Sequence, residues 1–246
     1  MTDDDLKLRF ERDGYALLPS VFSTEEVAQL RSRLEAVLFR DEEHSSLRNR
    51  AGAVYAARNV LELFPETETV WRRPSLTSFL NSVLGARFGL VRALYFDKPP
   101  GLTWGLPWHK DLTIAIESPG SFSEQIPAGH WRKLTRKAGV PHVEADCETL
   151  QRMVTLRIHL DPARAENGAL RIVPGSHRAG KELDLSRPEQ LAIAETGDVF
   201  AMSPLLSHCS GRSAEGTELH RRILHLEFSG AEQLPFGFRW RNFLAS

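Results

Sequence analysis

A histidine and an aspartate stand two residues apart near the middle of the chain, in the run from Gly105 to Thr113. We expect His109 and Asp111 to lie on extended chain, where side chains alternate between two faces, so both should point to one face. An imidazole nitrogen and a carboxylate oxygen on one face can bind a divalent metal together. A second histidine would complete the arrangement typical of non-haem Fe(II) oxygenases. Because His-x-Asp also occurs by chance, a metal site needs support from other features.

Two segments further along the chain could complete such a site. His208 follows a predicted strand and a turn, and the hydroxyl of Ser210 lies two residues beyond it. Arg221 stands at the start of a later predicted strand, and arginine presents a planar fork that suits bidentate binding of a carboxylate. A metal triad with a buried arginine and a hydroxyl is what a dicarboxylate cosubstrate requires, because one end binds the metal and the other needs a cation.

The first 86 residues are predicted to be mostly helical. A short helix should end at Gly14, and a short strand is expected at 15–19. Ser23 and Glu26 form a capping box, and apolar residues at helical spacing follow it. This second helix should lay one apolar face on a sheet, and no residue in it indicates chemistry.

Two further segments complete the N-terminal part. Residues 41–58 are polar and are interpreted as a solvated loop, with a flexible lid as the alternative. A helix is predicted over 70–84, interrupted at Pro74 and ended by Gly85. No internal repeat and no low-complexity segment is found in the sequence.

From residue 87 the chain is predicted to be rich in strands. Segments of β-branched and aromatic residues alternate with Gly and Pro turns, at 90–98, 112–116, 153–160, 169–173, 198–203 and 221–228. Strands after a helical part predict an antiparallel sandwich or barrel with the helices packed outside. We expect one domain over 1–246, with a strand core at 87–246. The long basic stretch 117–146 is predicted to be an inserted loop and a lid.

Composition bounds the class of protein. The chain has 246 residues, 41% hydrophobic and 26% charged, with a net charge of -1, so nothing favours nucleic acid or an anionic membrane as a partner. No apolar run is long enough for a membrane span, and the acidic first residues lack the basic and apolar regions typical of a signal peptide. Two cysteines, Cys147 and Cys209, cannot form a disulfide framework. We therefore expect a soluble, cytoplasmic protein.

The motifs taken in order resemble the phytanoyl-CoA dioxygenase family. The resemblance covers most of the chain and rests on an ordered set with compatible spacings: Gly14-Tyr15-Ala16, Phe96-Asp97-Lys98-Pro99, His109-x-Asp111, the run from Glu166 to His177, His208-x-Ser210 and the strand at Arg221. It implies a mainly β fold, a double-stranded β-helix or jelly roll, with the N-terminal helices packed outside. It also implies an oxygenase that depends on Fe(II) and 2-oxoglutarate.

The resemblance assigns the site residues by position. The residues that match the metal ligands are His109, Asp111 and His208. Arg221 matches the arginine that holds the distal carboxylate of 2-oxoglutarate, and Ser210 matches a hydroxyl that assists it. The turn at His177 is interpreted as structural rather than as a source of a ligand.

Arg222 competes with Arg221 for the cosubstrate. Alternation places Arg222 with Leu224, Leu226 and Phe228, an apolar set that indicates packing. Arg221 shares its face with Ile223, His225 and Glu227, a more polar set. This pattern favours Arg221.

The predicted strand at 153–160 carries Arg157, which shares a face with His159. If this face points inward, Arg157 contacts the cosubstrate or the substrate, and we include it among the cofactor-binding candidates. Otherwise it is a solvated arginine. We expect His159 and His225 to line the interior or to satisfy a hydrogen bond.

The expected reaction follows from the family. Fe(II), 2-oxoglutarate and O2 would hydroxylate a small organic molecule with release of succinate and CO2, and ascorbate would support assays. Related halogenases lack the carboxylate ligand, so Asp111 favours hydroxylation or another oxidation. Two alternatives remain open, a jelly-roll protein that binds metal or a small molecule without turnover, and a zinc hydrolase. The sequence names neither the substrate nor the oligomeric state.

Overall fold

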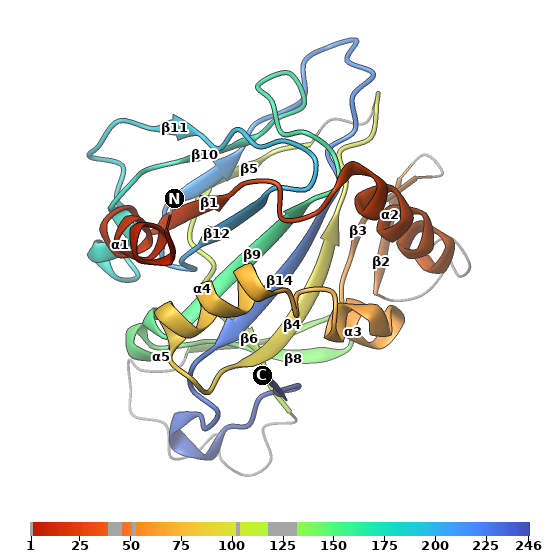
Figure 1. The fold of residues 1–246 in the computed structure, drawn as a ribbon. Coiled ribbons are helices and arrows are strands. Elements are labelled where there is room, and N and C mark those ends of the chain that lie inside the picture. Colours follow the sequence, from red (N-terminus) through yellow and green to blue (C-terminus); the bar gives the residue numbers. More distant parts are fainter. Residues whose placement is uncertain (1, 39–45, 51–52, 102–103, 118–131) are drawn as a thin grey trace.

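Two antiparallel sheets form the centre of the molecule (Figure 1). The structure, a computed structural model, describes residues 2–38, 46–50, 53–101, 104–117 and 132–246. The larger sheet has eight strands in the order β1-β12-β9-β14-β4-β3-β2, with β15 beside β4, and the smaller has the order β11-β10-β13-β5. This is the jelly-roll fold that the sequence predicts.

The strands of the larger sheet come from both halves of the chain. They are β1 (Tyr15–Leu18), β2 (Leu47–Arg50), β3 (Ala53–Ala57), β4 (Gly89–Phe96), β9 (Met153–His159), β12 (Val199–Met202), β14 (Ile223–Ser229) and β15 (Leu244–Ala245). The N-terminal strand β1 pairs with β12, so backbone hydrogen bonds join segments that are far apart in the sequence.

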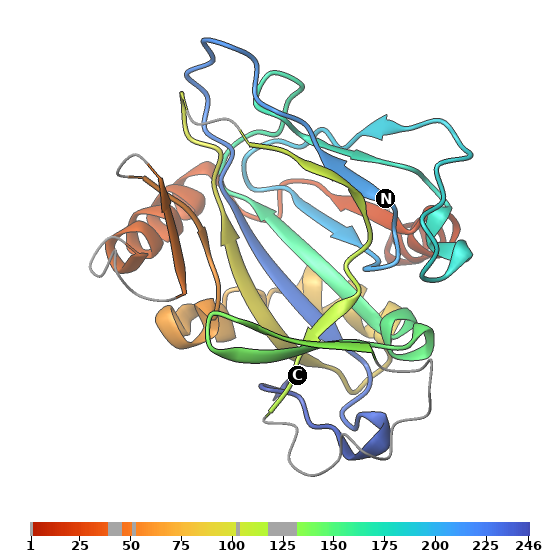
Figure 2. The ribbon, with the colours of Figure 1, turned by 180° about the vertical axis from the view of Figure 1, so that it is seen from behind.

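The smaller sheet consists of β5 (Leu106–His109), β10 (Leu170–Ile172), β11 (Gln190–Leu191) and β13 (His208–Ser210). A third sheet crosses the far end of the larger one and is clearest from behind (Figure 2). Its strands are β6 (Thr113–Ala115), β7 (Arg132–Lys137) and β8 (Val140–Glu144).

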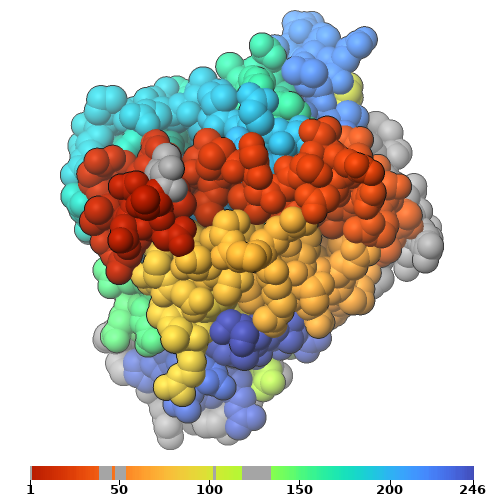
Figure 3. All heavy atoms as spheres, in the orientation of Figure 1, coloured from red at the N-terminus to blue at the C-terminus, as the bar shows by residue number. Residues whose placement is uncertain are grey.

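Helices cover one face of the larger sheet, as the space-filling view shows (Figure 3). The α-helices are α1 (Asp3–Asp13), α2 (Thr24–Leu38), α3 (Val60–Leu63), α4 (Pro74–Leu84) and α5 (Cys147–Gln151). Short 3-10 turns lie at Pro65–Glu68, Ser176–Ala179 and Pro235–Gly237. Among the described helices, none is long and apolar enough to cross a membrane.

The main core lies between these helices and the larger sheet. Apolar residues of α1, α2 and α4 pack against alternate residues of the strands, among them Leu156, Leu224, Leu226 and Phe228. Because strand side chains alternate, the residues between them face the other side of the sheet. That second face carries polar side chains and looks toward the smaller sheet.

Several local predictions agree with the structure. Helix α1 ends at Gly14 in the left-handed conformation, and the expected strand follows directly. The Ser23 Oγ accepts from the Glu26 N–H, and the Glu26 carboxylate accepts from the Ser23 N–H, which is the capping box.

The helix predicted over 70–84 differs from the structure at its start. Helix α4 begins at Pro74 instead of being interrupted there, because proline, which lacks an N–H, suits the first turn.

Two segments interpreted as loops contain strands, which corrects the sequence reading. Within 41–58, β2 and β3 form an antiparallel pair, and Ala56 of β3 pairs with Phe96 of β4. Within 117–146, β7 and β8 form an antiparallel pair and β8 also pairs with β6. One strand of each pair, β2 or β7, is rich in charged and polar residues and lies at the edge of its sheet, where no apolar run is needed. The remainder of the predicted lid, 118–131, lies outside the described residues.

Gly14 provides a test of the packing between α1 and the smaller sheet. It has φ 80, and a Cβ at this position would lie 2.6 Å from the His177 Nδ1. Gly14→Ala should lower the free energy of unfolding by about 2 kcal/mol or more, since the left-handed backbone alone costs about 1–2 kcal/mol. Chemical denaturation measures this loss.

Gly216→Ala is the matched control, because Gly216 also has positive φ, and a Cβ there would meet nothing within 4 Å. Gly216→Ala should lower the free energy of unfolding only by the cost of the left-handed backbone. Equal losses in the two variants would mean that the contact with His177 relaxes without cost.

Candidate active site

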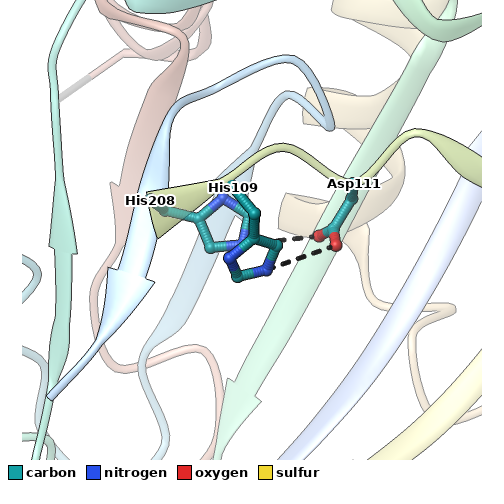
Figure 4. Close-up of side chains that lie close together, drawn as sticks. All are labelled: His109, Asp111 and His208. Atoms are coloured by element: carbon teal, nitrogen blue, oxygen red, sulfur yellow. Dashed lines mark ion pairs between the residues drawn. The ribbon is translucent and has the colours of Figure 1, made fainter. Parts of the chain in front are cut away.

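Strand pairing places two histidines opposite one another. His208 of β13 pairs directly with His109 of β5, and their ring centroids are 4.3 Å apart. Asp111 follows on the chain, with its carboxylate oxygens 3.9 Å from His109 Nε2 and 3.6 Å from His208 Nε2 (Figure 4). One ligand atom from each of the three residues lies within 4.8 Å of the others. This spacing suits a metal ion bound between them.

Backbone carbonyls fix the direction of both imidazole rings. The Nδ1 of His109 is 2.7 Å from the Pro107 oxygen, and the Nδ1 of His208 is 2.9 Å from the Leu206 oxygen. A carbonyl can only accept, so each Nδ1 carries the hydrogen and each Nε2 is left as a ligand atom. The Asp111 N–H donates to the Pro204 oxygen at 2.9 Å, which holds the carboxylate beside them.

The protonation of the three side chains also favours a cation. Burial lowers the pKa of His208 to about 4, although Asp111 opposes the shift, so this imidazole is neutral at pH 7. Burial raises the pKa of Asp111, but His208, His225 and His109 outweigh it and lower the pKa to about 2. Neutral imidazole and ionised carboxylate are the forms that bind a metal.

Lys110, between the two candidate ligands, points the opposite way. Its buried ammonium donates to the Ser176 oxygen at 2.9 Å and to the Gly180 oxygen at 2.8 Å. Ser176 Oγ in turn accepts from the N–H of Ser207, the residue before His208. The turn that carries His177 therefore ties both ligand-bearing segments together, as its structural interpretation suggests.

Arg221 is buried and lines the same cavity as the three candidate metal ligands. Its Nη2 is 3.3 Å from Ser210 Oγ, whereas its Nε and Nη1 have no hydrogen-bond partner among the described residues. Its backbone pairs with Lys98 just before β14 begins, so Arg221 is not within the strand but continues its alternation. A buried guanidinium with unsatisfied donors is costly, and an anion would relieve this cost.

Arg222 faces the helical layer, and carboxylates there engage all three of its guanidinium nitrogens. The guanidinium donates to Asp161 at 2.7 and 2.9 Å and to Glu35 of α2 at 2.5 Å. Arg222 is not among the described residues that line the cavity. Alternation along the chain therefore predicts correctly on which side of the sheet each arginine lies.

Lys98 exchanges backbone hydrogen bonds with Arg221, and sequence reasoning missed this residue. Its ammonium donates to the carbonyl oxygens of Gly168 and Gly211. Burial, followed by the nearby charges of Arg221 and Arg157, lowers the pKa of Lys98 to about 7. Its position in Phe96-Asp97-Lys98-Pro99 is the only signal that the sequence offered.

A cavity of about 490 Å³, part of it open to solvent, connects the candidate metal ligands with Arg221. Both sheets line it, and it contains each of the six residues proposed from sequence: His109, Asp111, Arg157, His208, Ser210 and Arg221. Arg157 is buried, so the alternative of a solvated arginine is wrong. His225 and Glu227, which alternation placed on the face of Arg221, also line the cavity. Arg92 lines it too, and the sequence did not indicate this residue.

Comparison with characterised proteins identifies the family of the chain. Residues 10–216 match the family model described as phytanoyl-CoA dioxygenase (PhyH). The chain is 27% identical over 189 residues to the L-proline trans-4-hydroxylase of Streptomyces griseoviridis, covering 75% of this chain and 59% of that protein. It is 21% identical to an ectoine dioxygenase of Nocardia farcinica, covering 88% of this chain and 69% of that protein.

Solved structures agree on the fold. EctD from S. alaskensis with bound Fe has a TM-score of 0.69 at 18% identity, covering 96% of this chain and 80% of that one. SnoN, described as a non-heme alpha ketoglutarate dependent epimerase from nogalamycin biosynthesis, has a TM-score of 0.67 at 18% identity, covering 96% and 86%. With the family model matching most of the chain, the protein belongs to the phytanoyl-CoA dioxygenase family.

Proposed function

We propose that this protein is an Fe(II)- and 2-oxoglutarate-dependent dioxygenase that hydroxylates a small organic molecule. The observation that carries the proposal is one cavity lined by a His-Asp-His cluster and by a buried arginine, two of whose nitrogens have no hydrogen-bond partner among the described residues. A metal site alone needs no such arginine. A dicarboxylate that bridges the cluster and the arginine needs both.

The residues would divide the binding as follows. His109, Asp111 and His208 would hold Fe(II) on one side, leaving positions for the cosubstrate and oxygen. The free fork of Arg221 would bind the distal carboxylate of 2-oxoglutarate, with Ser210 Oγ beside it. Burial, together with the charge of Arg157, lowers the pKa of Arg221 to about 9, so it remains charged at pH 7.

The metal would supply the oxygen chemistry, in which 2-oxoglutarate and O2 yield succinate and CO2 while one oxygen atom enters a C–H bond of the substrate. The chain's own part is geometry and shielding. The backbone contacts of His109, His208 and Asp111 hold the ligands before the metal arrives, which reduces the reorganisation needed on binding. The presence of Asp111 supports hydroxylation or another oxidation over halogenation.

The names of the relatives support a small-molecule substrate. A proline hydroxylase and an ectoine dioxygenase are among them, although the chain spans only 59% of the first. We propose a cytoplasmic location, because Cys147 and Cys209 are free thiols and a reducing compartment keeps iron ferrous.

Labelled 2-oxoglutarate distinguishes this function from its alternatives. Protein incubated with Fe(II), ascorbate, O2 and the label should release CO2 slowly without substrate and faster with it. A zinc hydrolase or a binding protein without turnover would release none. Absence of both 2-oxoglutarate binding and decarboxylation would overturn the proposed function.

The metal ligands can be tested by equilibrium binding. His109→Ala, Asp111→Ala and His208→Ala should each weaken anaerobic Fe(II) binding by about tenfold or more, since loss of even supporting contacts costs 10- to 100-fold. His177→Ala is the control, because His177 contacts the Glu11 carbonyl away from the cavity. Unchanged Fe(II) affinity in any of the first three variants would remove that residue from the site.

The cosubstrate anchor gives a second prediction. Removing one partner of a buried ion pair costs about 3–5 kcal/mol. Arg221→Ala should therefore raise the dissociation constant of 2-oxoglutarate by about two to three orders of magnitude, with little change in Fe(II) affinity. Arg221→Lys should recover part of the loss, because it keeps the charge without the fork. Calorimetric titration measures both.

Arg222→Gln is the matched control for this prediction. It breaks the contacts with Asp161 and Glu35 and should lower stability, but it should leave 2-oxoglutarate affinity near that of the wild type. A large loss of affinity in the Arg222 variant and none in the Arg221 variant would contradict the assignment.

A further inference from the structure

Four polar side chains form a hydrogen-bonded row across the cavity face of the larger sheet. Arg92 on β4 forms a two-point ion pair with Glu227 on β14, at 2.9 and 2.5 Å. Glu227 also lies 3.2 Å from His225 Nε2, and His225 Nδ1 lies 3.2 Å from Arg157 Nη1 on β9. All four line the cavity beside the candidate metal ligands. Neither the metal site nor the cosubstrate anchor requires this row.

The hydrogen bonds in the row have one consistent direction. A guanidinium only donates, so His225 Nδ1 accepts from Arg157 and His225 Nε2–H donates to the Glu227 carboxylate. Arg92 and His225 thus both donate hydrogen bonds to the Glu227 carboxylate, and both ring nitrogens of His225 take part in hydrogen bonds. Arg157 sits at the end of the row and, among the described residues, makes its single hydrogen bond to His225.

Arg157 therefore carries a buried charge that forms no ion pair with a carboxylate among the described residues. It is 6% exposed, and it lines the cavity. Burial lowers its pKa to about 10, while the nearby Asp111 raises it, so it is still charged at pH 7. When Asp111 binds a metal, its charge is committed there, and Arg157 then requires another anion.

The cosubstrate does not supply that anion. In the proposed function, one carboxylate of 2-oxoglutarate binds the metal and the other binds Arg221, so both of its charges are used. Among the described residues that line the cavity, the cations are Arg92, Arg157 and Arg221, and the anions are Asp111 and Glu227. This leaves one positive charge. The charges of Fe(II) and 2-oxoglutarate cancel, so their binding leaves the sum over these described residues at one positive charge.

Positive charge also gathers on the Arg92 side of the site. Lys137 of β7 donates to Thr113 Oγ1 at 2.8 Å, and its pKa is lowered by burial and then by Arg92 and Arg58. Burial, and after it the charge of Arg92, lowers the pKa of His142 to about 4, so this histidine adds no charge at pH 7. Arg92, Arg58 and Lys137 thus bring positive charge to this side, beside the carboxylates of Asp111 and Glu227, which raise the pKa of Lys137.

We propose that the substrate of this enzyme is a small carboxylic acid whose carboxylate binds to Arg157. This inference rests on the proposed function and names the class of its substrate. The row from Arg92 to His225 holds the guanidinium in place, and Arg157 would place the carbon skeleton of the substrate next to the metal. A planar guanidinium fork matches a carboxylate in two-point geometry, which favours a carboxylate over other anions.

Binding of matched acids and amides tests the proposal without turnover. Protein loaded with Fe(II) and 2-oxoglutarate under anaerobic conditions is titrated with small acids, L-proline among them, each beside its own amide. At least one acid should bind about 30-fold or more tightly than its amide, which is the scale for losing one side of a buried charge pair. If no acid binds better than its amide, the proposal is wrong.

Arg157→Gln shows whether this residue causes the preference. Glutamine keeps a donor for His225 but lacks the charge, so the variant should bind acid and amide alike. Its 2-oxoglutarate affinity should stay within about threefold of the wild type. Arg171→Gln is the control for loss of positive charge, since Arg171 is exposed and pairs with Glu189, and it should keep the preference.

Two results separate this inference from the proposed function. If Arg157→Gln raises the 2-oxoglutarate dissociation constant tenfold or more, Arg157 belongs to the cosubstrate site and the substrate assignment is overturned. If wild-type protein with Fe(II) binds no 2-oxoglutarate, the proposed function itself fails. Tight 2-oxoglutarate binding without any preference for acids rejects the substrate class alone.

Discussion

The antiparallel pairing of β5 with β13 is the constraint on which the site depends. It places His208 opposite His109, and the register then shifts so that Ser210 pairs with Leu106. Because side chains alternate with a period of two, a slip of one residue would turn either histidine away from the cavity. The contacts of Lys110 with the turn at Ser176 oppose such a slip, since they tie the end of β5 to the chain just before β13.

Strand β14 links the site to the core through the same alternation. Its residues Leu224, Leu226 and Phe228 pack in the core beneath the helices, whereas His225 and Glu227 line the cavity. The helical layer therefore supports the site without contributing to it: Arg222 on the helical side is held by Asp161 and by Glu35 of α2. This division explains why the helices carry no chemistry.

Much of the site could be predicted because its signals are local. The spacing of His109 and Asp111 and the polar face that includes Arg221 are visible in single segments of sequence. Contacts between distant strands leave no such signal: Arg92 and Glu227 are 135 positions apart and meet only through the pairing of β4 with β14. The β2–β3 and β7–β8 pairs were missed for a similar reason, since the polar sequences of β2 and β7 become strands only beside a partner.

The concentration of positive charge in the cavity has a cost in the ligand-free protein. Burial lowers the pKa of both Arg157 and Arg221, and the charge of Arg157 adds to the shift at Arg221, so each bears a desolvated charge close to another cation. An anion that binds either arginine removes part of this unfavourable energy. Ligands that bind only the folded state also stabilise it, in proportion to the logarithm of their concentration over the dissociation constant. Arg157 and Arg221, which bind the ligands in this proposal, therefore also make the stability of the folded protein depend on those ligands.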